Sequence, residues 1–592
     1  MAKKKNKKLE APKKSGSRNP YLAFLKKNQT TVGLLLILLL GVVVYSNTFA
    51  VPFVFDDLSN ILYNPEVRSI NDALHAANSS RVVGVLSFAL NYRFNNENVT
   101  GYHAVNLVIH LANALMVFLF VFITFKTPFF REKLTNESGL KSQALIVALF
   151  SALFFVVHPV QTQAVTYVVQ RFASLATMFF LLSIFMYARF RLVSEVTEDK
   201  VPAHRLSMGP GVRKTVFYAI SLASAALAML TKEIAFTLPV IIALWEFSFF
   251  SGGIIKRILR LSPYFLILLL VPLSRILSGF PLLAATGEEG LSSLPSVTEY
   301  LFTQFRVLVT YLRLLVIPVA QNLDYDYPLY RSFTEPAVFL SFFFLTAVMA
   351  GGVLMYYLSA RKRDLAILRL AAFGVFWFFI TIAVESSIIP IADLIFEHRL
   401  YLPSIGFFLM AVAGVQAVAV TWPGRKGLTS KVAITAMALL VLVSAFMAFE
   451  RNNIWHDRIS LWQDVVEKSP GKARPQTNLG KAYSDNGELE KAQSHLVLAL
   501  AIKPDYTVAQ YVLGANYAMQ GKYDEATAWL HKATEIQPDF AEAYYQLGNI
   551  HVLQGRFDEA VLEYEEAIRI YPDYKEARNQ LEILKRLQSG TR

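Results

Sequence analysis

Residues 31–57 of the chain are TVGLLLILLLGVVVYSNTFAVPFVFDD. An apolar run of membrane-spanning length, Thr31 to Thr48, is followed by two adjacent aspartates, Asp56 and Asp57. The preceding tail, residues 1–28, is rich in lysine, and Glu10 is its only acid. Because basic flanks mark the cytoplasmic side, we expect a cytoplasmic tail, an uncleaved first span and both aspartates outside. The alternative is an interfacial loop whose acids cap the next helix.

The composition is that of a polytopic membrane protein. Hydrophobic residues make up 54% of the 592 residues, and the mean hydropathy is +0.40. The net charge of +13 comes mainly from the tail and from short loops between apolar runs, which is an orientation signal. We therefore predict no nucleic-acid partner. The chain has no cysteine, which excludes disulfides, thiol catalysis and thiolate metal sites.

The apolar runs predict about eleven spans within residues 29–450, with an outer loop at 51–103. The stretch 300–319 is also apolar, but it carries Arg306 and Arg313. If it spanned, the basic loops near 361–363 and 425–426 would lie outside, so we expect it to lie along or re-enter the outer surface. The odd count then places everything after Glu450 on the side of the aspartates. The predicted spans are Thr31–Thr48, Ala104–Phe125, Leu145–Val157, Phe172–Phe190, Val216–Leu230, Ile234–Phe250, Leu261–Leu273, Ala337–Leu358, Leu365–Val384, Leu400–Val420 and Val432–Phe449.

The C-terminal part follows a 34-residue period. Gly480, Gly514 and Gly548 recur at this spacing, and so do Pro504, Pro538 and Pro572. This is the tetratricopeptide pattern, in which small residues let two antiparallel helices pack closely. It predicts a connecting helix at 451–472 and a repeat domain at 473–588. The predicted units are 473–506, 507–540 and 541–574, followed by a terminal helix at 574–588. The expected fold is therefore all-α, with a membrane helical bundle followed by an α-solenoid.

Polar residues recur at helical spacing along the second span. His103, Asn106, His110 and Asn113 share one face, which must point into the bundle or into water because lipid cannot satisfy them. The two histidines are two turns apart, about 10 Å, too far to share one zinc ion. A hydrogen-bonded structural seam between helices is the alternative. No His/carboxylate metal motif or glycine-rich phosphate loop is present, so we expect no metal and no cofactor.

Charged residues flank two other spans on the predicted outer side. Lys232 and Glu233 end one span, and Glu397-His398-Arg399 precede another. Membrane-edge charges point to a functional site. Together with the aspartates they suit chemistry at a membrane-anchored phosphate, in which the cations hold the phosphate and a carboxylate accepts a hydroxyl proton. Structural ion pairs are the alternative.

These motifs together resemble the transmembrane and tetratricopeptide repeat-containing protein O-mannosyltransferases and their bacterial relatives. The resemblance rests on their order and spacing along nearly the whole chain. The segments that carry it are Phe53–Asp57 with Asn64-Pro65, Gly101–Asn106 with His110, His158-Pro159-Val160 through Arg171, Thr231–Glu233, and Glu397–Pro403.

The resemblance implies a GT-C-type glycosyltransferase that passes a sugar from a polyprenyl-phosphate carrier to a protein hydroxyl on the non-cytoplasmic side. Asp56 or Asp57 would be the general base, and Lys232, Arg399, Arg81 and Arg171 would bind the carrier phosphate. The implied sugar pocket comprises His103, Asn106, His110, His158, Glu233, Glu397 and His398. The chain departs from its relatives at Val82, where they tend to have proline, and at Gln163, where they tend to have an acid.

The repeats are expected to bind a protein acceptor. Thr477, Tyr511 and Tyr545 occupy the first inward positions, which suits a general peptide ligand better than a carboxylate clamp. The resemblance thus implies a multi-pass glycosyltransferase that transfers a hexose such as mannose. We expect it in a bacterial inner membrane with periplasmic repeats, or, in a eukaryote, with repeats in the lumen of the endoplasmic reticulum. A transporter of lipid-linked sugars and a non-catalytic envelope scaffold are the alternatives.

Overall fold

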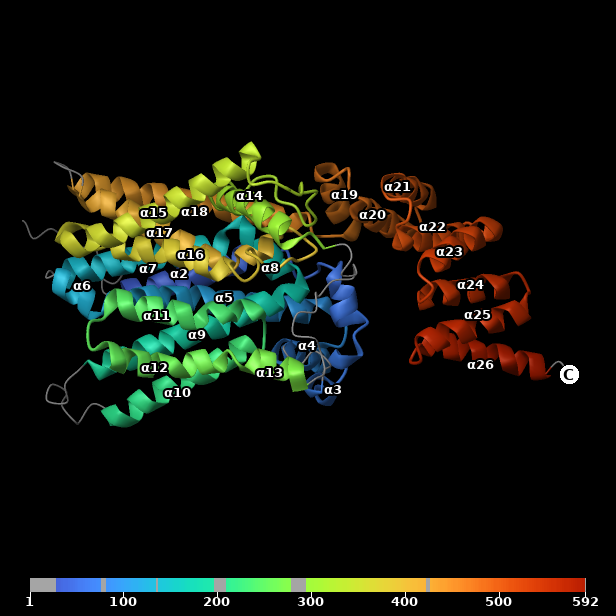
Figure 1. Ribbon diagram of the computed structural model, residues 1–592, viewed down its shortest axis with the longest axis horizontal. Coiled ribbons are helices and arrows are strands. Elements are labelled where there is room, and N and C mark those ends of the chain that lie inside the picture. The colour runs from blue at the N-terminus through green and yellow to red at the C-terminus, as the bar shows by residue number, and fades with distance from the viewer. Residues whose placement is uncertain are drawn as a thin grey trace, which may run out of the picture.

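The computed structural model describes residues 28–75, 81–134, 137–195, 209–277, 294–421 and 426–590. Within these ranges every regular element is a helix (Figure 1). A bundle of long, roughly parallel helices forms one half of the molecule, and a stack of short helix pairs forms the other. The predicted fold class, an all-α membrane bundle followed by tetratricopeptide repeats, is confirmed. The tail, residues 1–27, and Arg425 lie outside the described residues.

Eight helices in the described part are long and apolar enough to cross a membrane, and they correspond to eight of the eleven predicted spans. A ninth, α2, is apolar but has 16 residues, which makes it about 24 Å long. The two remaining predicted spans, Ile234–Phe250 and Leu261–Leu273, coincide with shorter helices, the first with α11 and the second with the pair α12 and α13. The helices of this part are α2 (Gln29–Val44), α5 (Val99–Thr124), α6 (Pro128–Lys133), α7 (Glu137–Val157), α9 (Arg171–Ser194), α10 (Pro210–Met229), α11 (Leu238–Phe249), α12 (Ile254–Ile267), α13 (Leu270–Leu277), α15 (Pro336–Arg361), α16 (Leu368–Ile382), α17 (Pro403–Thr421) and α18 (Lys426–Asn453).

The stretch predicted to lie along the outer surface forms α14 (Val297–Val316), which is not one of the eight. A capping box of Ser296 and Glu299 starts it. Its buried residues, among them Tyr300, Gln304 and Tyr311, recur at helical spacing on one face. In Figure 1, α14 lies in the half of the bundle that is nearer to the repeats.

Close backbone contact holds the centre of the bundle together. At Gly374 of α16, an added Cβ would meet the carbonyl oxygen of Gly406, on α17, at 2.3 Å. Only glycine permits this approach, which is typical of helix packing in membranes. By contrast, the outer faces of α15 and α18 expose large apolar side chains such as Leu354 and Val443, as expected for surfaces that contact lipid.

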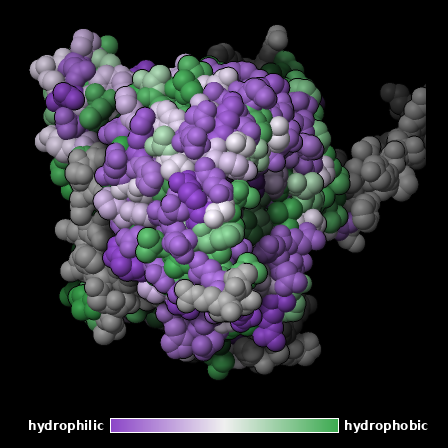
Figure 2. Space-filling view, turned by 90° about the vertical axis from the view of Figure 1, so that its right-hand side faces the viewer, coloured by the Kyte–Doolittle hydropathy of each residue, from purple (hydrophilic) through white to green (hydrophobic). Residues whose placement is uncertain are grey.

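The loop between α2 and α5 covers one end of the bundle. It forms η1 (Leu58–Leu62), η2 (Pro65–Val67), α3 (Ile70–Leu74) and α4 (Val82–Asn95). Its Phe53 and Val54 share an apolar cluster with Trp455, Trp462 and Leu479, which follow α18. The segment Phe53–Asp57, here called the aspartate loop, and the start of the repeats therefore lie at the same end of the bundle. Seen from the repeat side, this end of the molecule is mostly hydrophilic (Figure 2).

The repeats form a regular stack of antiparallel helix pairs. An added Cβ at Gly480, Gly514 or Gly548 would meet a side chain of the paired helix at 2.7, 2.8 and 2.6 Å respectively, which explains the recurring glycine. The predicted connecting segment 451–472 contains the end of α18 and a separate helix. The helices after α18 are α19 (Arg458–Lys468), α20 (Ala473–Asp485), α21 (Leu489–Ile502), α22 (Thr507–Met519), α23 (Tyr523–Ile536), α24 (Ala541–Leu553), α25 (Phe557–Ile570) and α26 (Lys575–Gly590).

Candidate functional site

Three of the predicted phosphate-binding cations form one cluster at the end of the bundle that bears the repeats. Arg81 precedes α4, Lys232 precedes η8 (Glu233–Thr237), and Arg399 lies in η11 (Glu397–Leu400). Arg81 pairs with Glu233, with Nη2 3.0 Å from Oε2, and Lys232 pairs with Glu385 at 2.8 Å. The structure therefore brings together residues that are more than 300 positions apart in the sequence.

Arg399 differs from the other two cations because its charge has no direct partner. It is 5% exposed, and its Nη1 and Nη2 donate to the carbonyl oxygens of Leu394 (3.2 Å) and Asp393 (2.8 Å). Across the residues that the structure describes, no carboxylate forms an ion pair with Arg399. Burying an unpaired charge is costly, so this guanidinium is suited to receive an anion.

The balance of charge around Arg399 is positive. Arg81 and Lys232 are paired with Glu233 and Glu385, and Asp393, the other acid near Arg399, is paired with Arg474, so the positive charge of Arg399 is left over. His398 lies within this field, and burial together with Lys232, Arg399 and Arg81 holds the pKa of its imidazole well below the usual value. The ring is therefore neutral at pH 7. Its Nδ1 has no hydrogen-bond partner in the described part of the chain.

The two aspartates have different surroundings. Asp57 is fully buried, and its carboxylate accepts hydrogen bonds from the backbone N–H groups of Val169 (2.6 Å) and Val54 (3.1 Å). Burial raises the pKa of Asp57 to about 8. Asp56 is half-buried, and its backbone N–H donates to the hydroxyl of Tyr167 at 2.8 Å. Asp57 thus ties the loop to the start of α9, while Asp56 keeps access to solvent.

The backbone just before the aspartates is strained. Phe55 has φ of +50°, a conformation that non-glycine residues rarely adopt. Its ring packs against Tyr167 and against the edge of Trp462 in α19, with ring centroids 6.4 and 5.7 Å apart. Contacts from both the bundle and the connecting helix therefore hold the aspartate loop in place.

Arg171, the fourth predicted phosphate-binding cation, is fully buried and has its own set of partners. Its Nε donates to Asn106 (2.7 Å), its Nη2 to Asn91 (2.8 Å) and to the carbonyl of Tyr102 (3.0 Å), and its Nη1 to the carbonyl of Ser87 (3.2 Å). Four of its five donor hydrogens are used within the protein. It therefore has little remaining capacity to bind a phosphate.

The polar stripe of α5 forms the hydrogen-bonded seam that the sequence left open as an alternative. His103 contacts the carbonyl of Val51 (2.9 Å), and Asn106 donates to two backbone carbonyls at 3.2 Å. His110 contacts the Tyr401 hydroxyl (2.7 Å) and the Val156 carbonyl. His158 is buried, and its Nδ1 accepts from the N–H of Val160 at 3.3 Å.

Glu397 anchors a segment that sequence reasoning did not single out. Its carboxylate accepts hydrogen bonds from Gln321 Nε2 (2.8 Å), the backbone N–H of Asn322 (2.7 Å) and the Tyr325 hydroxyl (2.6 Å). Burial raises its pKa. The neighbouring Asp324 and the more distant Asp393 also were not predicted, and the only signal in the sequence was the alternation of acids and tyrosines at 324–327.

A cavity of about 690 Å³ lies between the end of α18, α19 and residues 318–321. None of the predicted site residues lines it, although Gln321, which binds Glu397, does. Among the described residues, no group of three His, Asp or Glu side chains is placed to hold a metal ion.

Known proteins similar to this chain include protein O-mannosyl-transferases of animals. Protein O-mannosyl-transferase TMTC3 of Homo sapiens is 26% identical over 79% of this chain and 51% of its own length. Protein O-mannosyl-transferase F38B6.6 of Caenorhabditis elegans is 24% identical over 81% of this chain and 64% of its own length. The chain thus spans about half to two-thirds of the length of the curated relatives it matches.

Family models and solved structures match different parts of the chain. Tetratricopeptide repeat models match residues 473–506 and 541–580, and a TPR repeat model matches 516–555. A solved oligosaccharyltransferase from Archaeoglobus fulgidus is 11% identical and covers 86% of this chain and 73% of its own, with a TM-score of 0.36. This score is too low to support any conclusion about the fold.

The resemblance predicted from the sequence is thus confirmed. Over about four-fifths of its length the chain is similar to transmembrane and tetratricopeptide repeat-containing protein O-mannosyl-transferases, and it carries tetratricopeptide repeats at its C-terminal end.

Proposed function

We propose that the protein is a membrane glycosyltransferase that transfers a sugar, a hexose such as mannose, from a polyprenyl-phosphate carrier to a protein hydroxyl. The observation that carries this proposal is the buried Arg399, which has no carboxylate partner among the described residues and lies beside Lys232 and Arg81. The similarity to protein O-mannosyl-transferases supports the same class of reaction.

In this proposal the carrier phosphate binds at Arg399 and Lys232. A guanidinium binds two phosphate oxygens at once, and the lysine adds a point charge. The neutral imidazole of His398, with its unpaired Nδ1, lies where it can accept a sugar hydroxyl hydrogen. Ile388 and Ile389, between Glu385 and Asp393, are 59% and 53% exposed and offer apolar surface to the polyprenyl chain.

The reaction is a direct displacement at the anomeric carbon. The acceptor oxygen forms a bond to this carbon as the bond to the phosphate oxygen breaks, which inverts the configuration. The proton of the hydroxyl passes to Asp56, and the leaving phosphate keeps the bonding electron pair and is stabilised by Arg399 and Lys232. We assign the base to Asp56 because it is half-exposed, whereas Asp57 is buried and protonated at neutral pH.

The acceptor is a protein segment held near the repeats. The aspartate loop and the first repeat helix share an apolar cluster, so both face the same compartment. We place this end of the bundle in the periplasm of a bacterial inner membrane, with the N-terminal tail in the cytoplasm, because basic residues concentrate in the tail and in the loops at the other end.

The test is transfer by the purified full-length protein in proteoliposomes that contain a polyprenyl-phosphate hexose. Mass spectrometry measures the hexose added to a serine- and threonine-rich peptide, and chromatography measures the released polyprenyl phosphate. Asp56→Asn should lower the rate about 10²- to 10⁴-fold, because a general base contributes that much. Arg331→Ala, at a side chain that is 80% exposed, is the matched control and should retain full activity. Equal rates for Asp56→Asn and wild type would remove Asp56 from the mechanism.

A further inference from the structure

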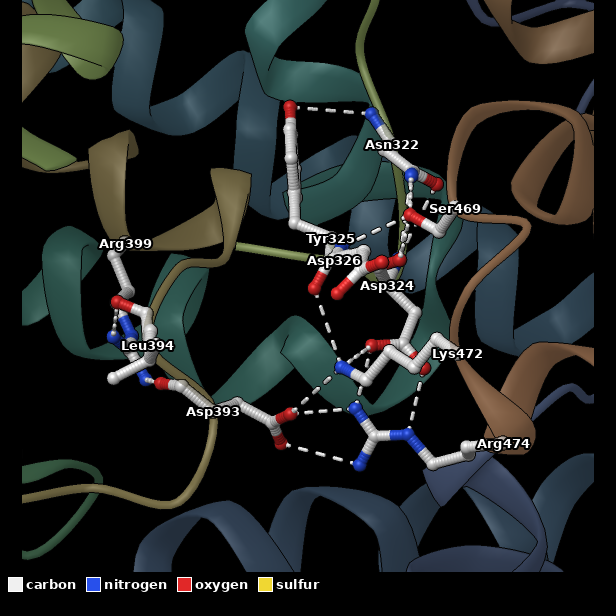
Figure 3. Close-up of polar contacts among 10 residues, drawn as sticks. All are labelled: Asn322, Asp324, Tyr325, Asp326, Asp393, Leu394, Arg399, Ser469, Lys472 and Arg474. Carbon is white, nitrogen blue, oxygen red and sulfur yellow. Dashed lines mark hydrogen bonds and ion pairs between the residues drawn. The ribbon is translucent and has the colours of Figure 1, made fainter. Parts of the chain in front are cut away.

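An ionic clamp ties the first repeat helix to the membrane bundle (Figure 3). Arg474 of α20 binds Asp324 through two parallel hydrogen bonds, from Nε to Oδ2 and from Nη2 to Oδ1, both at 2.7 Å. Its Nη2 also lies 2.5 Å from Oδ1 of Asp393. Lys472 forms an ion pair with Asp324 as well. The clamp therefore joins three segments: residues 324, 393 and 472–474.

The two acids of the clamp depend on these cations. The side chain of Asp324 is 1% exposed, so an isolated charge there would be expensive. Burial alone would raise its pKa, but the hydrogen bonds and charges of Arg474 and Lys472 hold the pKa of Asp324 below its usual value. Asp393 is 25% exposed and is held less tightly. Removing Arg474 would leave Asp324 with Lys472 alone, and Asp393 would keep only a longer ion pair of 3.9 Å to the same lysine.

The clamp connects directly to Arg399. Figure 3 shows the side chain of Asp393 directed toward Arg474, while its main-chain carbonyl oxygen accepts from Nη2 of Arg399 at 2.8 Å. The next carbonyl, of Leu394, accepts from Nη1. These hydrogen bonds orient the Arg399 guanidinium. The first comes from Asp393, which Arg474 binds, and the second from the next residue, Leu394, whose carbonyl also accepts from Gln304 Nε2 at 3.0 Å.

A second connection joins the repeats to η11, the short helix that contains Arg399. Asn322 and Tyr325, which flank Asp324, donate to Glu397 at 2.7 and 2.6 Å, and Glu397 lies two residues before Arg399. The Ser469 hydroxyl, just before the repeats, donates to the Asp324 carbonyl at 2.9 Å and accepts from Asn322 Nδ2 at 2.8 Å. Residues 469–474 therefore contact both Asp393, whose carbonyl holds Arg399, and the segment 322–325 that bonds Glu397 in the helix of Arg399.

We propose that Arg474 is a positioning residue: docking of the first repeat helix through Asp324 and Asp393 sets the orientation in which Arg399 binds the phosphate of the donor. This inference rests on the proposed function, since it assigns Arg399 to the carrier phosphate. It makes the repeats part of the donor site as well as a surface for the acceptor. A displacement of the first repeat helix, for instance by a bound acceptor, changes the affinity for the donor phosphate.

The first experiment is a double-mutant cycle on the full-length protein in detergent, with farnesyl phosphate as probe and farnesol as the phosphate-free control. Arg474→Ala should weaken farnesyl phosphate binding about 5- to 10-fold in the wild-type background and leave farnesol binding unchanged. In the Arg399→Ala background, Arg474→Ala should have no further effect, because its effect passes through Arg399. Arg474→Lys, which keeps the charge but lacks the two-pronged contact, should restore binding only in part.

The matched control is Arg569→Ala, which removes an exposed ion pair with Glu566 in the last helix pair and should change nothing. If Arg474→Ala binds farnesyl phosphate as wild type does, or loses the same factor in both backgrounds, the inference is wrong. Asp393→Ala releases the same carbonyls without removing a charge from the repeats, and it should match Arg474→Ala if the latter proves unstable.

The second experiment separates this inference from the proposed function. Hydrogen exchange of the full-length protein without any ligand should become faster at residues 393–400 in Arg474→Ala and stay unchanged in Arg569→Ala. Unchanged exchange at 393–400 in Arg474→Ala overturns the positioning role whatever the ligand. If exchange becomes faster in Arg474→Ala but the wild-type protein does not bind farnesyl phosphate, the positioning role stands and the carrier site of the proposed function is wrong.

Discussion

Two buried arginines at the same end of the bundle differ in what surrounds them. Arg171 is fully buried, and four of its donor hydrogens are used by asparagines and backbone carbonyls. Arg399 is 5% exposed, and its guanidinium donates to two backbone carbonyls in a cluster with net positive charge. The comparison teaches that burial of a cation does not by itself identify a binding site. A binding site is indicated instead by a cation whose charge or hydrogen-bond donors are not already used within the protein.

The opposite end of the bundle gives a further contrast. Arg191 and Arg257 share the fully buried Glu246, with nitrogen–oxygen distances of 2.7 and 3.4 Å. The Tyr187 hydroxyl donates to the same carboxylate. Each of these arginines has a direct carboxylate partner, as expected for a structural network. The unpaired Arg399 therefore stands out against both Arg171 and this pair.

Among the variants that test this comparison of arginines, the largest effect is expected from Arg399→Ala. Removing a donor to the leaving phosphate should lower the transfer rate about 10²- to 10³-fold. Thermal unfolding should change little, because Arg399 forms no ion pair with a carboxylate in the described part of the chain. Transfer assays and fluorescence-detected unfolding of the same preparation measure both. A loss of stability with an unchanged transfer rate would show that Arg399 has a structural role, like Arg171.

Arg171→Ala should lower the stability of the protein and leave its phosphate binding unchanged, the reverse of Arg399→Ala. It leaves the side-chain oxygens of Asn106 and Asn91 without donors in a buried site, which should lower the free energy of unfolding by about 3 kcal/mol. Farnesyl phosphate affinity per folded molecule should remain as in wild type. Measurements of unfolding in detergent and of farnesyl phosphate binding test this. A loss of phosphate affinity without a loss of stability would show that Arg171 belongs to the carrier site.

The pH dependence of stability should report Asp57. Its folded-state pKa is about 8, above the usual value of 3.8, so the folded protein binds a proton that the unfolded chain releases. This contribution is fully present below about pH 4 and is lost as the pH rises through about 8, with a slope of at most about 1.4 kcal/mol per pH unit. Unfolding midpoints from pH 5 to pH 8 should fall in wild type and stay flatter in Asp57→Asn. Parallel curves would show that Asp57 does not titrate in this range.

The smallest effect is expected from Arg81→Gln. Arg81 is already paired with Glu233, and its side chain is 27% exposed, so its loss should weaken farnesyl phosphate binding by about 1 kcal/mol, roughly fivefold. Glu233→Gln should strengthen binding, because it frees Arg81 and removes a negative charge. Titration calorimetry distinguishes the two signs, and equal weakening by both variants would argue for a purely structural pair.

Sequence reasoning singled out charged residues at the predicted membrane edge, but it could not tell which of them are already bonded within the protein. Lys232, Arg399, Arg81 and Arg171 were one group of phosphate-binding candidates in the sequence. The structure separates Arg171 from the others because its partners Asn91 and Asn106 come from α4 and α5, which meet only in the folded bundle. The pairing of Arg474 with Asp324 and Asp393 could not be predicted from the sequence, since it joins residues 81 and 150 positions apart.

The sequence by itself determined the helical class, the membrane-length apolar helices before the repeats and the repeat architecture, because these follow from local periodicity. Hydrophobic runs, a 34-residue period and small residues at fixed positions are properties of neighbouring residues and need no tertiary contact. The tertiary structure alone decided which carboxylate is buried, which arginine lacks a partner and how the repeats dock. Each of these depends on the electrostatic environment made by distant segments, and that environment exists only after the helices have packed.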